Sequence, residues 1–122
     1  MEKPIFFIGE ELSDKTRQWL QRQQIQYIEH PFHKIGKFIS ETFDAYLFFS
    51  PSGIDGFKAS GNFPYPHSLV FANENSTART AWRFFTNKVH TSPIPEELSF
   101  VQYSIFRWMK ETNISLVQEN DY

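Results

Sequence analysis

The chain has 122 residues, a formal net charge of −2 and no cysteine. This length suits a single domain with a substantial core. The charge does not favour nucleic acid as a partner, and the lack of cysteine excludes disulfides, thiolate metal sites and thiol nucleophiles. Aromatic residues make up 18% of the chain, a share large enough to suggest that some of them cover an interface.

The first residues do not follow the pattern of a secretion signal. A short apolar stretch ends at Glu10 and Glu11, which makes it too short for a signal peptide. No later segment has the length and apolar character of a membrane span. We therefore expect a soluble, cytoplasmic protein that binds neither a membrane nor nucleic acid.

Apolar runs and turn residues predict strands and helices in alternation. Strands are predicted at residues 5–8, 25–28, 46–49, 69–72 and 89–91. Helices are predicted over 14–23 after a Ser13 cap, from Ser50-Pro51 onward, from an Asn75 or Ser76 cap to about residue 85, and through 98–109. Residues 30–42 are interpreted as a connector, 56–66 as a loop and those from 111 onward as a frayed tail. This alternation predicts an α/β fold with an open, mostly parallel, five-stranded sheet and helices on both faces, as in flavodoxin-like proteins.

The most informative segment is 43–57, in which a buried strand leads directly into a capped helix. Ser50 supplies an N-cap hydroxyl and Pro51 takes the first helical position, while Ser52 offers a second cap at the capping distance from Asp55. Such a junction places backbone N–H groups at the carboxyl edge of a sheet. Open α/β folds bind anionic ligands at that edge.

Other small α/β classes do not fit the sequence. A flavodoxin needs a Ser/Thr-rich phosphate loop after its first strand, whereas this turn carries Glu10 and Glu11, whose carboxylates would repel a phosphate. A response-regulator receiver needs an aspartate where Ser50 stands. Neither a G-x-G-x-x-G nor a Walker-type motif is present, so dinucleotide and P-loop chemistry have no support.

Taken in order, these pieces resemble the uroporphyrinogen-III synthase family. The matching segments are Phe43-Asp44-Ala45 with Phe48-Phe49-Ser50-Pro51-Ser52-Gly53-Ile54, then Ser76-Thr77-Ala78, then 93–98. The resemblance covers nearly the whole chain, which corresponds to one half of a normal family member. It implies a uroporphyrinogen-III synthase half-domain and a cofactor-free lyase of tetrapyrrole (porphyrin and heme) biosynthesis. Such an enzyme closes hydroxymethylbilane into a ring, inverting the last pyrrole and releasing water.

The resemblance also implies where a polycarboxylate tetrapyrrole would bind. The candidate substrate-binding residues are Gly9, Ser50, Ser52, Gly53, Ser76 and Thr77. Helix capping is the alternative role for the serines and Thr77, and a strand end is the alternative for Gly9. No catalytic residue and no metal ligand is assigned, because His30 and His33 have no third ligand near them in the sequence.

The chain departs from the family pattern at three positions. Phe32 stands where the family often has a tyrosine facing the cleft, and Phe49 replaces a threonine. Glu74 or Asn73 replaces a glycine, and a carboxylate there would oppose the binding of a polyanion. A non-catalytic homologue that binds a tetrapyrrole, another polyanion or a protein partner is therefore the alternative interpretation.

Two arrangements of a half-length chain stay open. Residues 1–122 could close on themselves as a single domain. Alternatively, residues 1–29 could swap onto a partner through the 30–42 connector and rebuild a two-domain shape as a homodimer. The surplus of aromatic residues favours the dimer.

Overall fold

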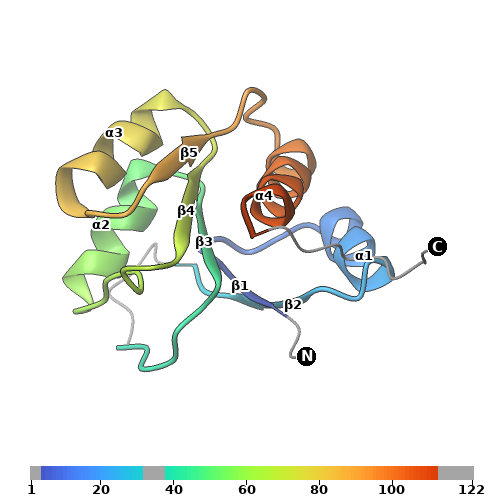
Figure 1. Cartoon of the computed structure of the whole chain (residues 1–122), viewed down its shortest axis with the longest axis horizontal. Helices are drawn as coiled ribbons and strands as arrows, with labels where there is room; N and C mark the ends of the chain where they lie inside the picture. The colour runs from blue at the N-terminus through green and yellow to red at the C-terminus, as the bar shows by residue number, and fades with distance from the viewer. Residues whose placement is uncertain (1–3, 32–37, 113–122) are drawn as a thin grey trace.

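The computed structural model describes residues 4–31 and 38–112 of the chain. Its strands are β1 (Ile5–Ile8), β2 (Gln26–Glu29), β3 (Ala45–Phe48), β4 (Leu69–Ala72) and β5 (Val89–Thr91). Its helices are α1 (Asp14–Arg22), α2 (Pro51–Ala59), α3 (Asn75–Phe84) and α4 (Glu97–Thr112). The strands form one sheet in the order β2-β1-β3-β4-β5, and every neighbouring pair is parallel. Figure 1 shows α1 and α4 on one face and α2 and α3 on the other, so the expected α/β fold is confirmed.

The central strands are covered on both faces, as the apolar run in the third predicted strand indicates. All four residues of β3 are buried, whereas the residues of the edge strand β2 alternate between exposed and half-buried. Successive side chains of a strand point to opposite faces. Phe6 and Ile8 therefore face α4, whereas Phe7, which lies between them, faces α2.

Each face of the sheet carries its own apolar cluster. The cluster under α1 and α4 includes Phe6, Ile8, Leu20, Leu47, Phe71, Phe100, Ile105 and Trp108. The cluster under α2 and α3 includes Phe7, Tyr46, Phe48, Ile54, Phe57, Val70, Ala81 and Phe85. Many of the chain's aromatic side chains therefore lie in the core. The large side chains that stay exposed in the described residues include Phe38, Phe63, Tyr65, Trp82 and Phe106.

Helix α2 corrects the loop predicted over residues 56–66. The helix continues to Ala59 because Phe57 is buried against Phe48 and Phe85, and this packing outweighs the low helix propensity of Gly56. The chain leaves the helix at Gly61, whose φ of 85° lies in the left-handed region that glycine tolerates best.

Two further predictions about element ends are corrected, and part of the predicted connector lies outside the described residues. Helix α3 has Glu74 as its N-cap residue, not Asn75 or Ser76. Helix α4 runs to Thr112, past the predicted start of a frayed tail at Glu111. There the hydroxyl of Thr112 donates to the Trp108 carbonyl at 2.7 Å and prolongs the helix. Phe32, His33 and much of the 30–42 connector lie outside the described residues.

Candidate functional site

The carboxyl edge of the sheet is the candidate site. Because the strands are parallel, their carboxyl ends meet at one edge, and each helix begins just after a strand has ended there. The order of the strands reverses between β1 and β3, since the chain passes from β1 outward to β2 and then returns to β3 on the other side. Ligands of open α/β proteins bind in the crevice at such a point.

Four of the predicted site residues come together at this reversal. Ser50 caps α2, with its Oγ accepting a hydrogen bond from the backbone N–H of Gly53 at 3.0 Å. The Oγ of Ser52 lies 3.1 Å from that of Ser50 and is exposed. Gly9 is buried beside them, and its carbonyl oxygen lies 3.8 Å from where a side chain on Gly53 would begin.

Close packing favours glycine at position 9 of this junction. A Cβ on Gly9 would lie 3.2 Å from the carbonyl oxygen of Leu47, which is backbone and cannot turn aside. The N–H of Gly9 donates to that same oxygen at 2.9 Å. Phe49, directly after β3, packs edge-to-face on Phe100 with ring centroids 4.9 Å apart. The Ser52 hydroxyl is exposed at this junction and can contact a ligand.

The other two predicted residues, Ser76 and Thr77, lie in the first turn of α3. Thr77 is fully buried, and its hydroxyl donates to Oδ1 of Asn73 at 2.8 Å. Ser76 is half-buried, and its side chain lines an open cavity. Thr77 therefore positions Asn73, whereas Ser76 can face a ligand.

This cavity has a volume of about 450 Å³ and lies between the start of α3 and the segment after β5. Its lining residues are Asn73, Glu74, Asn75, Ser76, Arg79, Thr91, Ser92, Pro93 and Pro95. The volume falls within the range of small-molecule sites. Asn73 and Arg79 were missed as site residues in the sequence. The position of Asn73 directly after a parallel strand is the signal that could have identified it.

The helix starts at this edge differ in what occupies them. The N-terminus of α1 is filled by the chain's own Glu97, whose carboxylate accepts hydrogen bonds from the Ser13 backbone N–H at 3.3 Å and the Ser13 hydroxyl at 2.6 Å. It also accepts one from the hydroxyl of the fully buried Thr16. A ligand acid group would have to displace Glu97 to reach α1.

Two more helix starts are filled in a similar way. Ser50 occupies the start of α2, and the Glu96 carboxylate accepts from the backbone N–H and hydroxyl of Ser99 at the start of α4. These bonds from Ser99 lower the pKa of Glu96. At α3, by contrast, the side chain of the N-cap residue Glu74 makes no capping hydrogen bond. Its first N–H groups therefore face the cavity without a side-chain cap.

The loop between β1 and α1 is fixed by Glu29. Its carboxylate pairs with the Arg17 guanidinium at 2.8 Å and accepts from the Leu12 backbone N–H at 3.1 Å. The hydrogen bond from Arg17 lowers the pKa of Glu29, so the carboxylate stays charged at neutral pH. The wall of the site next to Gly9 is thus held rigidly by groups of this chain.

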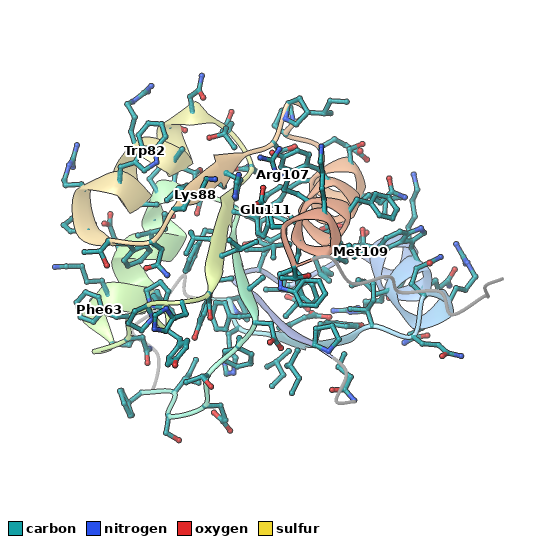
Figure 2. All side chains as sticks on the ribbon, in the orientation of Figure 1. Phe63, Trp82, Lys88, Arg107, Met109 and Glu111 are labelled. Atoms are coloured by element: carbon teal, nitrogen blue, oxygen red, sulfur yellow. The ribbon has the colours of Figure 1, made fainter. Side chains whose placement is uncertain are left out.

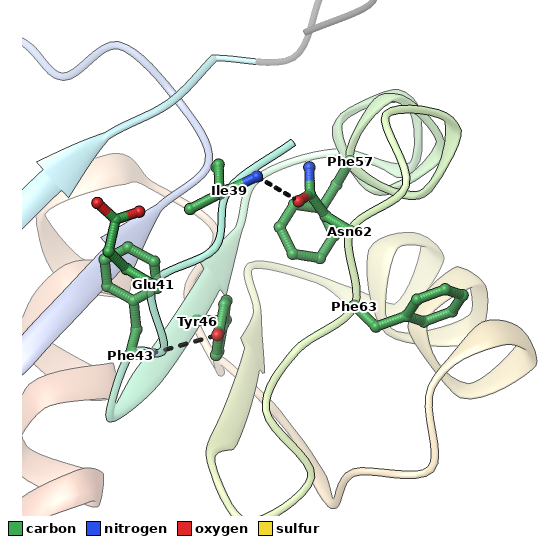
Figure 3. A pocket seen from close by; sticks show the side chains of 7 residues that line it. All are labelled: Ile39, Glu41, Phe43, Tyr46, Phe57, Asn62 and Phe63. Carbon is green, nitrogen blue, oxygen red and sulfur yellow. Dashed lines mark hydrogen bonds between the residues drawn. The ribbon is translucent and has the colours of Figure 1, made fainter. Parts of the chain in front are cut away.

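A second cavity lies at the opposite, amino edge of the strands and is too small for a ligand. Figure 3 shows it between the start of β3 and the segment after α2, lined among others by Tyr46 and Phe57. Its volume is about 10 Å³, which is at the lower limit for holding a single water molecule. The Tyr46 hydroxyl there accepts from the Phe43 backbone N–H at 3.3 Å, which is a structural role.

The described residues were also searched for metal-ligand clusters and membrane-spanning helices, and the chain was compared with known proteins. Across residues 4–31 and 38–112, no three His, Cys, Asp or Glu side chains gather in a way that would hold a metal ion. In the same ranges no helix has the length and apolar composition needed to cross a bilayer. In comparisons with protein-family models, curated proteins and solved structures, no match was found.

Proposed function

We propose that this chain is a uroporphyrinogen-III synthase-type protein of tetrapyrrole biosynthesis. In this proposal it holds the acidic side chains of hydroxymethylbilane at the carboxyl edge of the sheet while the ring closes, the last pyrrole inverts and water leaves. The order of the sequence segments around Ser50, Ser76 and Pro93 supports it. All three segments follow strands that end at this edge.

The observation that carries the proposal is the open cavity at the start of α3. Arg79 and the uncapped N–H groups of the first turn offer positive charge and donors to a carboxylate. Ser52, at the neighbouring start of α2, adds an exposed hydroxyl. Holding a flexible linear substrate in a folded pose can by itself supply several kcal/mol of barrier lowering, on the order of 7 in favourable cases.

A specific observation favours the non-catalytic alternative. The carboxylate of Glu74 lines the same cavity and opposes the binding of several acid groups at once. A homologue that binds a tetrapyrrole or another polyanion without converting it would tolerate this residue better than an enzyme would.

The deciding experiment supplies hydroxymethylbilane made enzymatically in situ and separates the uroporphyrin isomers after oxidation. We expect type III isomer in excess of the protein-free control. The type I isomer alone, which forms spontaneously, would refute the lyase. Tight binding of the bilane in the same samples would then support the non-catalytic alternative.

We also propose that the chain works as a homodimer in which a second copy completes the cleft. Exposed aromatic side chains such as Phe38, Phe63 and Trp82 support an additional interface. Sedimentation at micromolar concentration tests this proposal. A single species of 14.5 kDa would refute it.

A further inference from the structure

The side-chain amide of Asn73 is the polar group that the fold leaves open at the α3 cavity. Asn73 is only 9% exposed, and its Oδ1 accepts from the Thr77 hydroxyl at 2.8 Å. Its backbone N–H donates to the Phe48 carbonyl at 3.3 Å, which fixes the residue to β3. With Oδ1 engaged, the amide nitrogen Nδ2 has no partner in the part of the chain that the structure describes, and the side chain lines the cavity. Among the described residues the fully buried side-chain atom without a partner is Nε2 of His90, so Nδ2 of Asn73 reaches the solvent of the cavity, where its two N–H groups can donate to a ligand.

Arg79 supplies a cation to the same cavity. It lies one turn after Ser76 on α3, is exposed, and makes no ion pair with any described residue. The backbone N–H groups of residues 75–77 precede the first intrahelical hydrogen bond, which runs from Ala78 to the Glu74 carbonyl. The side-chain amide of Asn73, the guanidinium of Arg79 and the backbone N–H groups at the start of α3 are thus three kinds of hydrogen-bond donor at one cavity.

The charges around the cavity limit what it can hold. Glu74 offsets the charge of Arg79, so the net positive charge left is about the half charge of the helix N-terminus. A singly charged group suits this balance, whereas a doubly charged phosphate would face the Glu74 carboxylate. The planar fork of an arginine also matches the two oxygens of a carboxylate.

We propose that the cavity is a carboxylate-binding site in which Asn73 and Arg79 contact the ligand's acid group. The two oxygens accept from Nδ2 of Asn73, the Arg79 guanidinium and the N–H groups at the start of α3. This site does not require the ligand to be a tetrapyrrole, because Asn73 and Arg79 would bind the carboxylate of any small acid that fits the cavity.

NMR titration of the ¹⁵N-labelled protein with propionate tests the proposal. We expect saturable shifts of the Asn73 side-chain amide and of the backbone amides of Ser76 and Thr77. Arg79→Gln should weaken the binding about tenfold, because a hydrogen bond to a charged group is lost. Arg83→Gln is the matched control, since Arg83 lies one turn further along the exposed side of α3 and does not line the cavity.

A second variant separates binding from folding. Asn73→Asp keeps an acceptor for the Thr77 hydroxyl but replaces the two amide donors by a negative oxygen, so it should retain the fold and lose propionate binding. Equal weakening in Arg79→Gln and Arg83→Gln, or unchanged binding in Asn73→Asp, would overturn the proposal. Tighter binding of inorganic phosphate than of propionate near neutral pH would overturn the preference for a carboxylate. A lack of type III uroporphyrin would not affect these outcomes, so the two proposals can fail separately.

Discussion

Ser50 stabilises the start of α2 through one hydrogen bond from the Gly53 backbone N–H. Ser50→Ala should therefore lower the free energy of unfolding by about 1 kcal/mol. Ser52→Ala is the matched control, because among the described residues the exposed Ser52 hydroxyl bonds only to the Ser50 hydroxyl. It should change stability by less than about 0.5 kcal/mol. Urea unfolding of both variants measures the difference. Equal losses would show that the cap is not the stabilising contact.

His90 is a buried base whose Nε2 has no hydrogen-bond partner among the described residues. It is 7% exposed, and its ring stacks on Phe71 with centroids 5.4 Å apart. The charged groups around it are Lys88, next to β5, and Arg107 and Glu111 on α4 (Figure 2). Burial lowers the pKa of His90, Arg107 and Lys88 lower it further, and Glu111 opposes them.

The lowered pKa of His90 makes stability depend on pH. The unfolded chain takes up this proton near the ordinary pKa of 6.5, whereas the folded chain takes it up only at lower pH. The contribution of neutral His90 is therefore complete above pH 6.5 and is lost as the pH falls toward the folded pKa. His90→Phe should show a smaller loss of unfolding free energy between about pH 7 and about pH 5 than the wild type.

An exposed histidine provides the control for this pH dependence. His67→Phe, at an exposed position, is the control for the effect of replacing a histidine by phenylalanine. Glu29, Glu96 and Glu111 have lowered pKa values and lose their contribution only as the pH falls below their ordinary value of 4.5, outside this window. If the unfolding free energy of His90→Phe falls with pH as steeply as that of the wild type, another group causes the pH dependence.

At the level of elements, Glu97 joins α4 to the start of α1. Glu97→Ala removes the acceptor for Ser13 and for the hydroxyl of the fully buried Thr16. The Thr16 hydroxyl would keep its 3.3 Å hydrogen bond with the Ser13 hydroxyl, but both hydroxyls would lose a charged acceptor. We therefore expect a loss of about 1–3 kcal/mol in the free energy of unfolding. Chemical denaturation measures it, and hydrogen exchange should accelerate at the start of α1.

The control for Glu97 is Asp55→Ala. Asp55 is an exposed carboxylate on α2 that makes no hydrogen bond or ion pair with the described residues. This variant should change stability by less than about 0.5 kcal/mol. Comparable losses in both variants would mean that removal of a negative charge, and not the contact with α1, is responsible.

The order and type of the elements could be predicted from the sequence because local signals and packing agree. Ser50-Pro51 marks a helix start in the sequence and in the structure. The apolar run predicted as a strand at 46–49 corresponds to the buried strand Ala45–Phe48, which begins and ends one residue earlier. Where they disagree, packing prevails. Gly56 indicated a loop, yet burial of Phe57 carries the helix through it. Glu74 is a weak capping residue, yet it is the N-cap of α3, two residues after the end of β4.

The candidate site was only partly predictable for a related reason. Ser50, Ser52 and Gly53 are neighbours in the chain, so their proximity follows from local structure alone. The cavity instead joins Asn73 and Arg79 to Ser92 and Pro95, and it exists only because β4 and β5 are adjacent in the sheet. Strand order is a long-range property that no local pattern in the sequence specifies.

At the scale of the whole molecule, the protection of backbone amides from hydrogen exchange should decrease from the centre of the sheet to its edges. β3 is paired on both sides and fully buried, whereas β2 pairs only with β1 and has Gln26 and Ile28 exposed. Native-state hydrogen exchange should be at least about tenfold slower in β3 than in β2, because amides of the core exchange through global unfolding. Equal rates in both strands would show that β2 opens only with the whole domain.

The difference between the occupied and the uncapped helix N-termini limits how many acid groups of a ligand one copy of the chain can bind. Side chains of Glu97, Ser50 and Glu96 occupy the N-termini of three of the four described helices. Among these helices, one copy of the chain therefore offers one uncapped N-terminus, that of α3, to an acidic ligand. Adding acid groups to a ligand should then raise its affinity for an isolated copy very little. If two copies share one ligand, the apparent affinity for a multi-acid ligand should rise steeply with protein concentration, as linked binding events do. The slope of that dependence would count the copies that hold each ligand.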